Sequence, residues 1–399
     1  MKKIWIPAIA ALTAFWIPAG TSQHDVTVLG VEVPVRVMDG DRFVDSLSLP
    51  DFELFENGVK QTVSGMYLIR KTDVERKESD RDGLPRLNRN FYMLFQLNDY
   101  NPRLNDAIDY FFEKVFIPGD AMTVMTVQNR YQLSPAALQS KSREKLAEEL
   151  KKIVRRDSAI GNSNYNTLLR ELKRITAGIG AGGGAESGAE EGTTTLELLF
   201  SRYKDSLNKM DQMRVVDEKS FLQFAASLRN IRGNKHVFFF YEKEYRPEIQ
   251  QSDLNRLLSN NQDNPNILAH LQDLFQLYAR TPSIDPQRIQ QAFGDSGICL
   301  HFLFINKEPE LEPGIFMREQ SEDIYDSFSQ VAAVTGGVID TSLNPAASFE
   351  KAVDAAESYY LLYYTPLNNI EDGKFREIRV KVTGKNYTLR HRPGYFARR

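Results

Sequence analysis

A buried strand that opens into a short polar loop, with a helix after it, constrains the fold of this chain most. Residues 91–97 are an almost continuous run of apolar and aromatic side chains, and the loop after them is polar. A helical pattern covers 104–116, and a second apolar strand pattern covers 121–127. This order predicts the opening of a doubly wound, mostly parallel α/β sheet, in which ligands are held by the loops at the carboxyl ends of the strands.

Strands and helices continue to alternate further along the chain. Apolar strand patterns fall at 235–241 and 298–305, with helix patterns between them. Such alternation predicts parallel strands joined by right-handed crossovers. We therefore expect an α/β domain that begins near Phe91, and we expect its glycine-rich stretch at 178–192 to be a flexible insert.

Both ends of the chain are β-rich. Residues 26–69 contain alternating strand patterns and a hairpin signal at Asn57-Gly58. Residues 358–397 return to alternating strands that have no helix of their own to pack on. Because each segment is marginal alone, we predict one small β module in which the two pack together, joined to the α/β domain by a charged linker at 70–88.

The N-terminus has the pattern of an export signal. Lys2 and Lys3 precede an apolar stretch over 4–19, and small residues follow. This order is typical of a secretory signal peptide, which we place at 1–22. The apolar run is short for a spanning helix and contains prolines, so we expect no stable membrane insertion after cleavage. The sequence predicts a periplasmic or secreted protein.

Composition narrows the class of partner. Charged residues are 26% and hydrophobic residues 42% of the 399-residue chain, which is a globular balance. The formal net charge is −3, and no basic face is interleaved with aromatics, so nucleic acid is not an expected partner. Cys299 is the only cysteine and lies in an apolar strand pattern, so we interpret it as a core residue.

Several short motifs, taken in order, resemble those of the bacterial von Willebrand factor A-related domain proteins, an exported family found in acidobacteria and their relatives. The motifs lie at 51–61, 118–120, 360–366, 372–376 and 392–397. The resemblance covers most of the chain after residue 26 and implies that 89–340 is an A-type domain. It also implies a protein-binding function. In such domains a carboxylate, two hydroxyls, a threonine and an aspartate hold Mg²⁺, which accepts a carboxylate from the partner.

This chain departs from that ligand pattern. The candidate residues for the ligand-side face are Asn98, Asp99, Tyr100, Asn101, Thr167 and Glu242. The loop after the first strand lacks the two hydroxyls, and Arg103 adds a positive charge that opposes cation binding. Thr167 matches the family's threonine, and Glu242 falls where an aspartate is expected. We therefore expect a degenerate ion site and no cofactor. The alternative is an unorthodox Mg²⁺ site whose ligands include Asp99, Thr167 and Glu242.

The sequence contains no recognisable catalytic motif. None of its five histidines forms an HExxH pair, and no Gly-x-Ser-x-Gly elbow is present. His236 and His301 lie on strand patterns, where a hydrogen-bonded core histidine is the simplest interpretation. We expect a non-enzymatic protein that binds another protein or an envelope component through loops 98–103, 161–167 and 242–247. Two alternatives stay open: a metal-dependent adhesion domain, and an accessory or scaffold of an envelope hydrolase or protease assembly.

A titration of the purified protein with Mg²⁺ or Mn²⁺ tests the degenerate-site prediction. We expect no binding heat in the micromolar range, because too few hard oxygen ligands gather at the predicted face. Isothermal titration calorimetry measures this directly. A micromolar response that Thr167→Ala abolishes would contradict the prediction.

Overall fold

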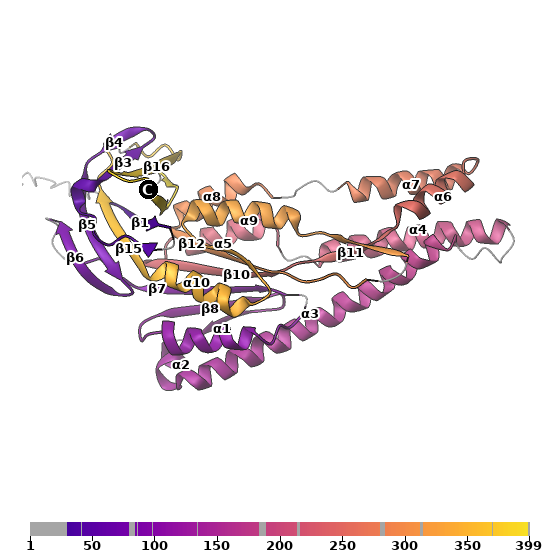
Figure 1. Cartoon of the computed structure of the whole chain (residues 1–399), viewed down its shortest axis with the longest axis horizontal. Coiled ribbons are helices and arrows are strands. Elements are labelled where there is room, and N and C mark those ends of the chain that lie inside the picture. The colour runs from indigo at the N-terminus through magenta and orange to yellow at the C-terminus, as the bar shows by residue number, and fades with distance from the viewer. Residues whose placement is uncertain are drawn as a thin grey trace, which may run out of the picture.

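The computed structural model describes residues 30–40, 42–79, 84–85, 87–97, 99–133, 135–182, 189–213, 216–279, 284–311, 314–368 and 370–397. Within these residues the strands form four sheets. Figure 1 shows a β module at one end, a mixed sheet with its helices in the middle, and a helical arm at the other end. The predicted signal peptide at 1–22 lies outside the described residues.

The mixed sheet forms the centre of the molecule and has the strand order β14-β12-β10-β7-β8-β9. Its strands are β7 (Arg89–Gln96), β8 (Ala121–Thr126), β9 (Arg130–Leu133), β10 (Asn234–Glu242), β12 (Ile298–Ile305) and β14 (Ile339–Ser342). Neighbours are parallel from β14 through β8, and β9 pairs antiparallel with β8. Every residue of β7 is buried, which explains the apolar run in its sequence.

Helices pack on both faces of the mixed sheet, because successive side chains of a strand point to opposite faces. Phe91 and Phe238 share one core with residues of α1, α3 and α10. Tyr92 and Phe239 share the other core with residues of α5, α8 and α9. The helices are α1 (Leu104–Tyr110), α2 (Pro135–Ser140), α3 (Arg143–Gly180), α5 (Glu218–Leu228), α8 (Pro286–Asp295), α9 (Glu322–Thr335) and α10 (Pro345–Glu357).

The β module combines strands from both chain ends in two sheets. One sheet has the order β17-β1-β15-β5-β6, with β2 paired to β1, and the other has the order β18-β16-β3-β4. The strands are β1 (Val31–Asp39), β2 (Arg42–Phe43), β3 (Phe52–Glu56), β4 (Val59–Gln61), β5 (Val63–Arg70), β6 (Asp73–Ser79), β15 (Ser358–Tyr364), β16 (Phe375–Val382), β17 (Thr388–His391) and β18 (Gly394–Phe396). Val33, Leu54 and Leu362 belong to the apolar core shared by the two sheets. The Glu56 carboxylate also accepts hydrogen bonds from the Tyr364 and Tyr395 hydroxyls, at 2.6 and 2.9 Å.

The helical arm extends from the mixed sheet on the side away from the β module (Figure 1). It consists of the second half of α3 together with α4 (Ala189–Gln212), α6 (Gln251–Asn260), α7 (Pro265–Tyr278), β11 (Tyr245–Ile249) and β13 (Ile315–Glu319). β11 and β13 pair as an antiparallel ribbon. The arm has its own apolar core, which includes Leu172, Tyr203 and Leu271. No helix of the described segments has both the length and the apolar character that crossing a bilayer requires.

The predicted fold class, a doubly wound and mostly parallel sheet, is wrong. Of the strand pairs in the described part of the chain, ten are antiparallel and four are parallel. Three sheets are antiparallel throughout and the fourth is mixed. β9 runs antiparallel because a short turn joins it to β8, and a parallel pair would need a long crossover. The prediction failed because it gave most weight to the strands joined through helices.

Two segments that the sequence analysis treated as connections are regular structure. β6 lies inside the predicted linker 70–88 and pairs with β5. The predicted ligand-side loop 161–167 lies inside α3. Gly161 is a packing residue rather than a turn residue, because a Cβ atom there would lie 3.0 Å from Cγ2 of Val127. The insert predicted at 178–192 includes the end of α3 and the start of α4, and its residues 183–188 lie outside the described residues.

A buried ion pair fixes the start of β7 to the turn before β8. Nε and Nη2 of Arg89 donate to the two carboxylate oxygens of Asp120, at 2.9 and 2.6 Å, and both side chains are almost fully buried. Asp120 also accepts the backbone N–H of Ile117 at 2.9 Å, and Arg89 donates to the carbonyl of Val115 at 2.7 Å. Removing one partner leaves the other charge buried and uncompensated.

We expect Asp120→Asn to lower the free energy of unfolding by about 3 to 5 kcal/mol, because the nearly isosteric amide leaves the Arg89 charge unpaired in the core. Urea unfolding followed by circular dichroism measures the change. The matched variant Glu53→Gln removes an ion pair with Lys60 at the surface and should change the midpoint little. Equal midpoints for wild type and Asp120→Asn would contradict the assignment.

Candidate functional site

The structure brings two of the predicted ligand-face residues together at the carboxyl edge of the mixed sheet. The backbone N–H of Asp99, after β7, donates to Oε2 of Glu242 at the end of β10, at 2.9 Å. Oε1 of Glu242 lies 3.5 Å from Nζ of Lys307. Glu242 is buried and Asp99 is exposed. Asn98 lies outside the described residues. Glu242 is therefore held by a backbone donor and a cation.

Tyr100 and Asn101 hold the loop that leads into α1. The Tyr100 hydroxyl donates to Oδ1 of Asn105, and the guanidinium of Arg155 lies 5.1 Å from the centre of the Tyr100 ring. Tyr100 is half-buried against the core beside α1. Oδ1 of Asn101 accepts the backbone N–H of Arg103 at 3.0 Å. These contacts give both residues a structural role in this loop.

Thr167 lies on the exposed surface of α3 instead of in a loop. Its hydroxyl donates to the carbonyl of Ser163 at 2.8 Å, one turn earlier in the same helix. Arg170, one turn later, lies with Nη2 3.5 Å from the same hydroxyl oxygen. The predicted site assumed that a loop would carry Thr167 toward the sheet edge, and the continuous helix replaces that loop.

The part of the arm that joins the mixed sheet, at Tyr165 on α3 and Tyr245 on β11, packs along the rest of this edge. We call it the arm root. Tyr165 on α3 donates its hydroxyl to the carbonyl of Tyr245 at 2.8 Å. Burial, and then the charges of Glu244 and Glu242, raise the pKa of Tyr165 well above its usual value. A cavity of about 200 Å³ remains there, with Gln96, Tyr165 and Glu244 in its wall. Tyr165 and Glu244 lie within the predicted loops 161–167 and 242–247 but were not among the predicted site residues, because nothing in their spacing shows that α3 passes this edge.

A second cluster of side chains with ligand chemistry lies inside the mixed sheet. His236 on β10 and Cys299 and His301 on β12 place one nitrogen or sulfur atom each within 4.8 Å of the others. Nε2 of His301 lies 3.5 Å from Nδ1 of His236 and 3.5 Å from Sγ of Cys299. Among the described residues this is the one group of three or more His, Cys, Asp and Glu side chains with such spacing. We call it the His-Cys-His cluster.

Hydrogen bonding explains this cluster without a metal ion. The backbone N–H of Val338 donates to Nδ1 of His301 at 3.3 Å, so the proton of the neutral ring is on Nε2, facing His236 and Cys299. A metal ligand would have to lose that proton, and ligating histidines normally donate through their other nitrogen instead. Nη2 of Arg36 also lies 3.8 Å from Sγ of Cys299 and adds positive charge. The cluster therefore fits a cation poorly.

Comparison with known proteins adds no further constraint. The chain matches no protein-family model, no curated protein and no solved structure. The resemblance to the von Willebrand factor A-related family stays a prediction from the sequence.

Because of the His-Cys-His cluster, we predict that the free energy of unfolding falls in acid. Burial lowers the pKa of His236 from 6.5 to about 3, with further contributions from Arg36 and Arg89. The unfolded chain therefore binds a proton at His236 between these two pH values while the folded chain does not, so stability is full above pH 6.5 and falls as the pH drops toward 3. His236→Gln should make the fall shallower, by up to about 1.4 kcal/mol per pH unit.

Urea unfolding of wild type and His236→Gln at several pH values from 7 to about 4.5 tests this prediction. The informative quantity is the slope of unfolding free energy against pH, because the substitution also changes packing at every pH. Parallel curves for the two proteins would contradict it.

Proposed function

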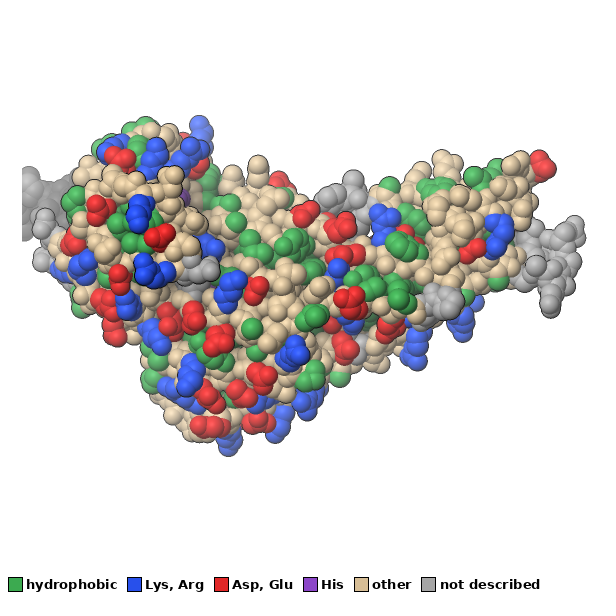
Figure 2. All heavy atoms as spheres, in the orientation of Figure 1, with side chains coloured by type: hydrophobic (Ala, Val, Ile, Leu, Met, Phe, Trp, Pro, Cys, Tyr) green, Lys and Arg blue, Asp and Glu red, His purple; other side chains and the backbone are tan. Residues whose placement is uncertain are grey.

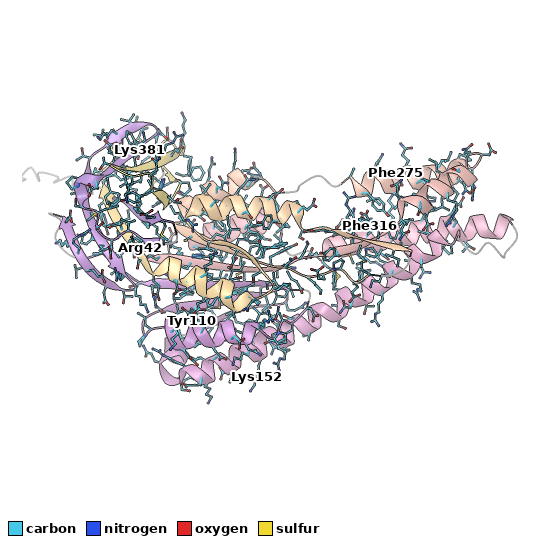
Figure 3. The ribbon with its side chains drawn as sticks, in the orientation of Figure 1. Arg42, Tyr110, Lys152, Phe275, Phe316 and Lys381 are labelled. Carbon is cyan, nitrogen blue, oxygen red and sulfur yellow. The ribbon has the colours of Figure 1, made fainter. Side chains whose placement is uncertain are left out.

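We propose that this chain is an exported, non-enzymatic protein that binds another protein through its helical arm. The observation that carries the proposal is a projecting arm with its own core and exposed large apolar side chains. Figure 2 shows such side chains among charged ones on the arm. Figure 3 labels two of them, Phe275 on α7 and Phe316 on β13. The two are 43% and 54% exposed. Exposed aromatic side chains are preferred anchors of protein interfaces.

The charges of the arm favour a protein partner selected by shape and apolar contact. Several cations of the arm are paired with acids, as in Lys204 with Asp273 at 2.8 Å and Lys173 with Glu310 at 2.6 Å. An arm with balanced charge creates no strong field for nucleic acid. Leu258 on α6 is also exposed. These features support a partner that offers an apolar groove to the arm.

The carboxyl edge of the mixed sheet supports a non-enzymatic role. The side chains there are held by structural contacts, such as Glu242 with Asp99 and Tyr165 with Tyr245. Thr167 lies on the outside of α3, which weakens the alternative of Mg²⁺-dependent adhesion. The arm root therefore packs against this edge, beside the cavity of about 200 Å³ that remains there.

Site-specific photo-crosslinking tests the proposed binding surface. With a benzophenone amino acid at position 275 or 316, we expect one host protein to be crosslinked in the native cell envelope, because both positions would lie in the interface. Position 367 is the matched control, since Leu367 is exposed on the β module. Mass spectrometry identifies the product. The double variant Phe275→Ser, Phe316→Ser should bind the purified partner about tenfold more weakly or worse.

Three outcomes would overturn the proposal. One is the same crosslinked product from position 367. Another is crosslinking only between copies of this chain, which would indicate self-association. The third is unchanged binding by the double variant. Fractionation of the same cells tests export, which predicts a processed protein of reduced mass in the periplasm or medium. A full-length protein in the cytoplasm would contradict export.

A further inference from the structure

A small cavity between the β module and the mixed sheet is lined by three buried or half-buried cations. Its volume is about 50 Å³, and its wall includes Arg36 from β1, Lys235 from β10 and Arg392 from the turn after β17. A larger cavity of about 590 Å³ adjoins it and shares Lys235, Gly297 and Arg392. The three cations come from distant parts of the sequence, and folding brings them to one place.

The hydrogen bonds of these cations leave their charge uncompensated. Nη1 of Arg36 donates to the carbonyl of Gly336 at 2.6 Å, and Nζ of Lys235 donates to the carbonyl of Ser296 at 2.8 Å. Arg392 donates only to backbone carbonyls, those of Glu32, Gly394 and Asp295 at 3.1 to 3.5 Å. Within the described residues none of the three cations forms a salt bridge with a carboxylate.

Arg36 adds a donor that has no acceptor. Its side chain is more than nine-tenths buried, and its Nε–H has no hydrogen-bond partner among the described atoms. A buried donor without a partner is unfavourable, and a buried charge without a counter-ion is more so. The wall of the small cavity thus includes an arginine with an unused donor and has unbalanced positive charge.

The nearest acids offset these charges only in part, because Glu32 and Asp295 act on Lys235 or Arg392 without forming a salt bridge with them. Glu32 and Asp295 line the larger cavity but not the smaller one. Glu32 is exposed, and Asp295 pairs with Arg229 at 3.0 Å. Burial, and then the charge of Arg392, lower the pKa of Lys235 to about 8. The surroundings of Lys235 therefore disfavour its own positive charge, which a bound anion would stabilise.

We propose that the small cavity binds an oxyanion, such as a phosphate, sulfate or carboxylate group, between Arg36, Lys235 and Arg392. A cavity needs a volume of about 10 to 15 Å³ to hold one water molecule. The small cavity, with about 50 Å³, therefore has room for a few water molecules or one oxyanion group. Arginine and lysine are the side chains that bind such groups best. The larger cavity offers room for the rest of a small organic molecule that carries the group. This site is independent of the binding role proposed for the arm.

Titration of the full chain with inorganic phosphate, sulfate and acetate tests the proposal, with chloride added to keep the ionic strength constant. We expect phosphate or sulfate to raise the melting temperature with a saturable dependence on concentration, since a ligand of the folded state stabilises it. Lys235→Met should weaken this binding about tenfold or more, because it removes a charge-assisted hydrogen bond. Arg379→Gln is the matched control, as Arg379 is exposed on β16, and it should bind like wild type.

The melting temperature in chloride alone shows whether each variant is folded. A variant that no longer binds anion is then not mistaken for one that has misfolded. Lys235→Met removes a buried charge, so in chloride alone it should melt at or above the temperature of wild type. Comparison of glycerol phosphate with inorganic phosphate distinguishes an organic ligand that also fills the larger cavity from a free ion. A saturable response that is equal in wild type and Lys235→Met would overturn the proposal. So would the absence of a saturable response to all the anions in folded wild type.

Discussion

The position of β15 is the constraint on which the rest of the structure depends. β15 begins directly where α10 ends, and α10 packs on the mixed sheet. In the β module it lies between β1 and β5 and pairs with both. A strand with two partners and no linker before it cannot shift without breaking one set of backbone hydrogen bonds. The β module is thereby fixed against the amino ends of the central strands, where the backbone N–H of Lys71 donates to the carbonyl of Glu357 at 2.8 Å.

The same junction determines which side chains meet. Asn234, at the start of β10, donates to the Tyr359 hydroxyl at 2.5 Å, so the two parts share a side-chain contact as well as the backbone hydrogen bond from Lys71. Arg36 extends from the β module to the carbonyl of Gly336 beyond α9. Because this joint is fixed, the cations around it stay buried although each alone would favour water. The unbalanced charge at the joint is a consequence of the architecture.

The buried strands could be predicted from the sequence more accurately than the fold class or the candidate functional site. The apolar runs at 91–97 and 235–241 coincide with β7 and β10, because strands buried on both faces leave a continuous apolar signal. β6 left no such signal, since it consists mostly of charged residues and lies at a sheet edge. The class prediction therefore gave too little weight to antiparallel pairing.

The site was harder to predict for a related reason. Asp99 and Glu242 could be placed together because each lies at the carboxyl end of a strand, and the two strands are neighbours in one sheet. Thr167 could not, because a glycine that serves close packing in α3 is indistinguishable in sequence from one that makes a turn. Arg36, Lys235 and Arg392 show no pattern at all. Such isolated cations come together only through the tertiary fold.

The continuity of α3 determines how the arm can move. Its 38 residues correspond to about 57 Å of helix, with the first half seated beside α1 and the second half in the core of the arm. One uninterrupted ladder of backbone hydrogen bonds therefore spans both parts. No loop interrupts the connection on this side, so a force applied at the tip of the arm is transmitted through the helix to the side of the mixed sheet. The arm is therefore rigidly connected to the mixed sheet and can transmit force to it.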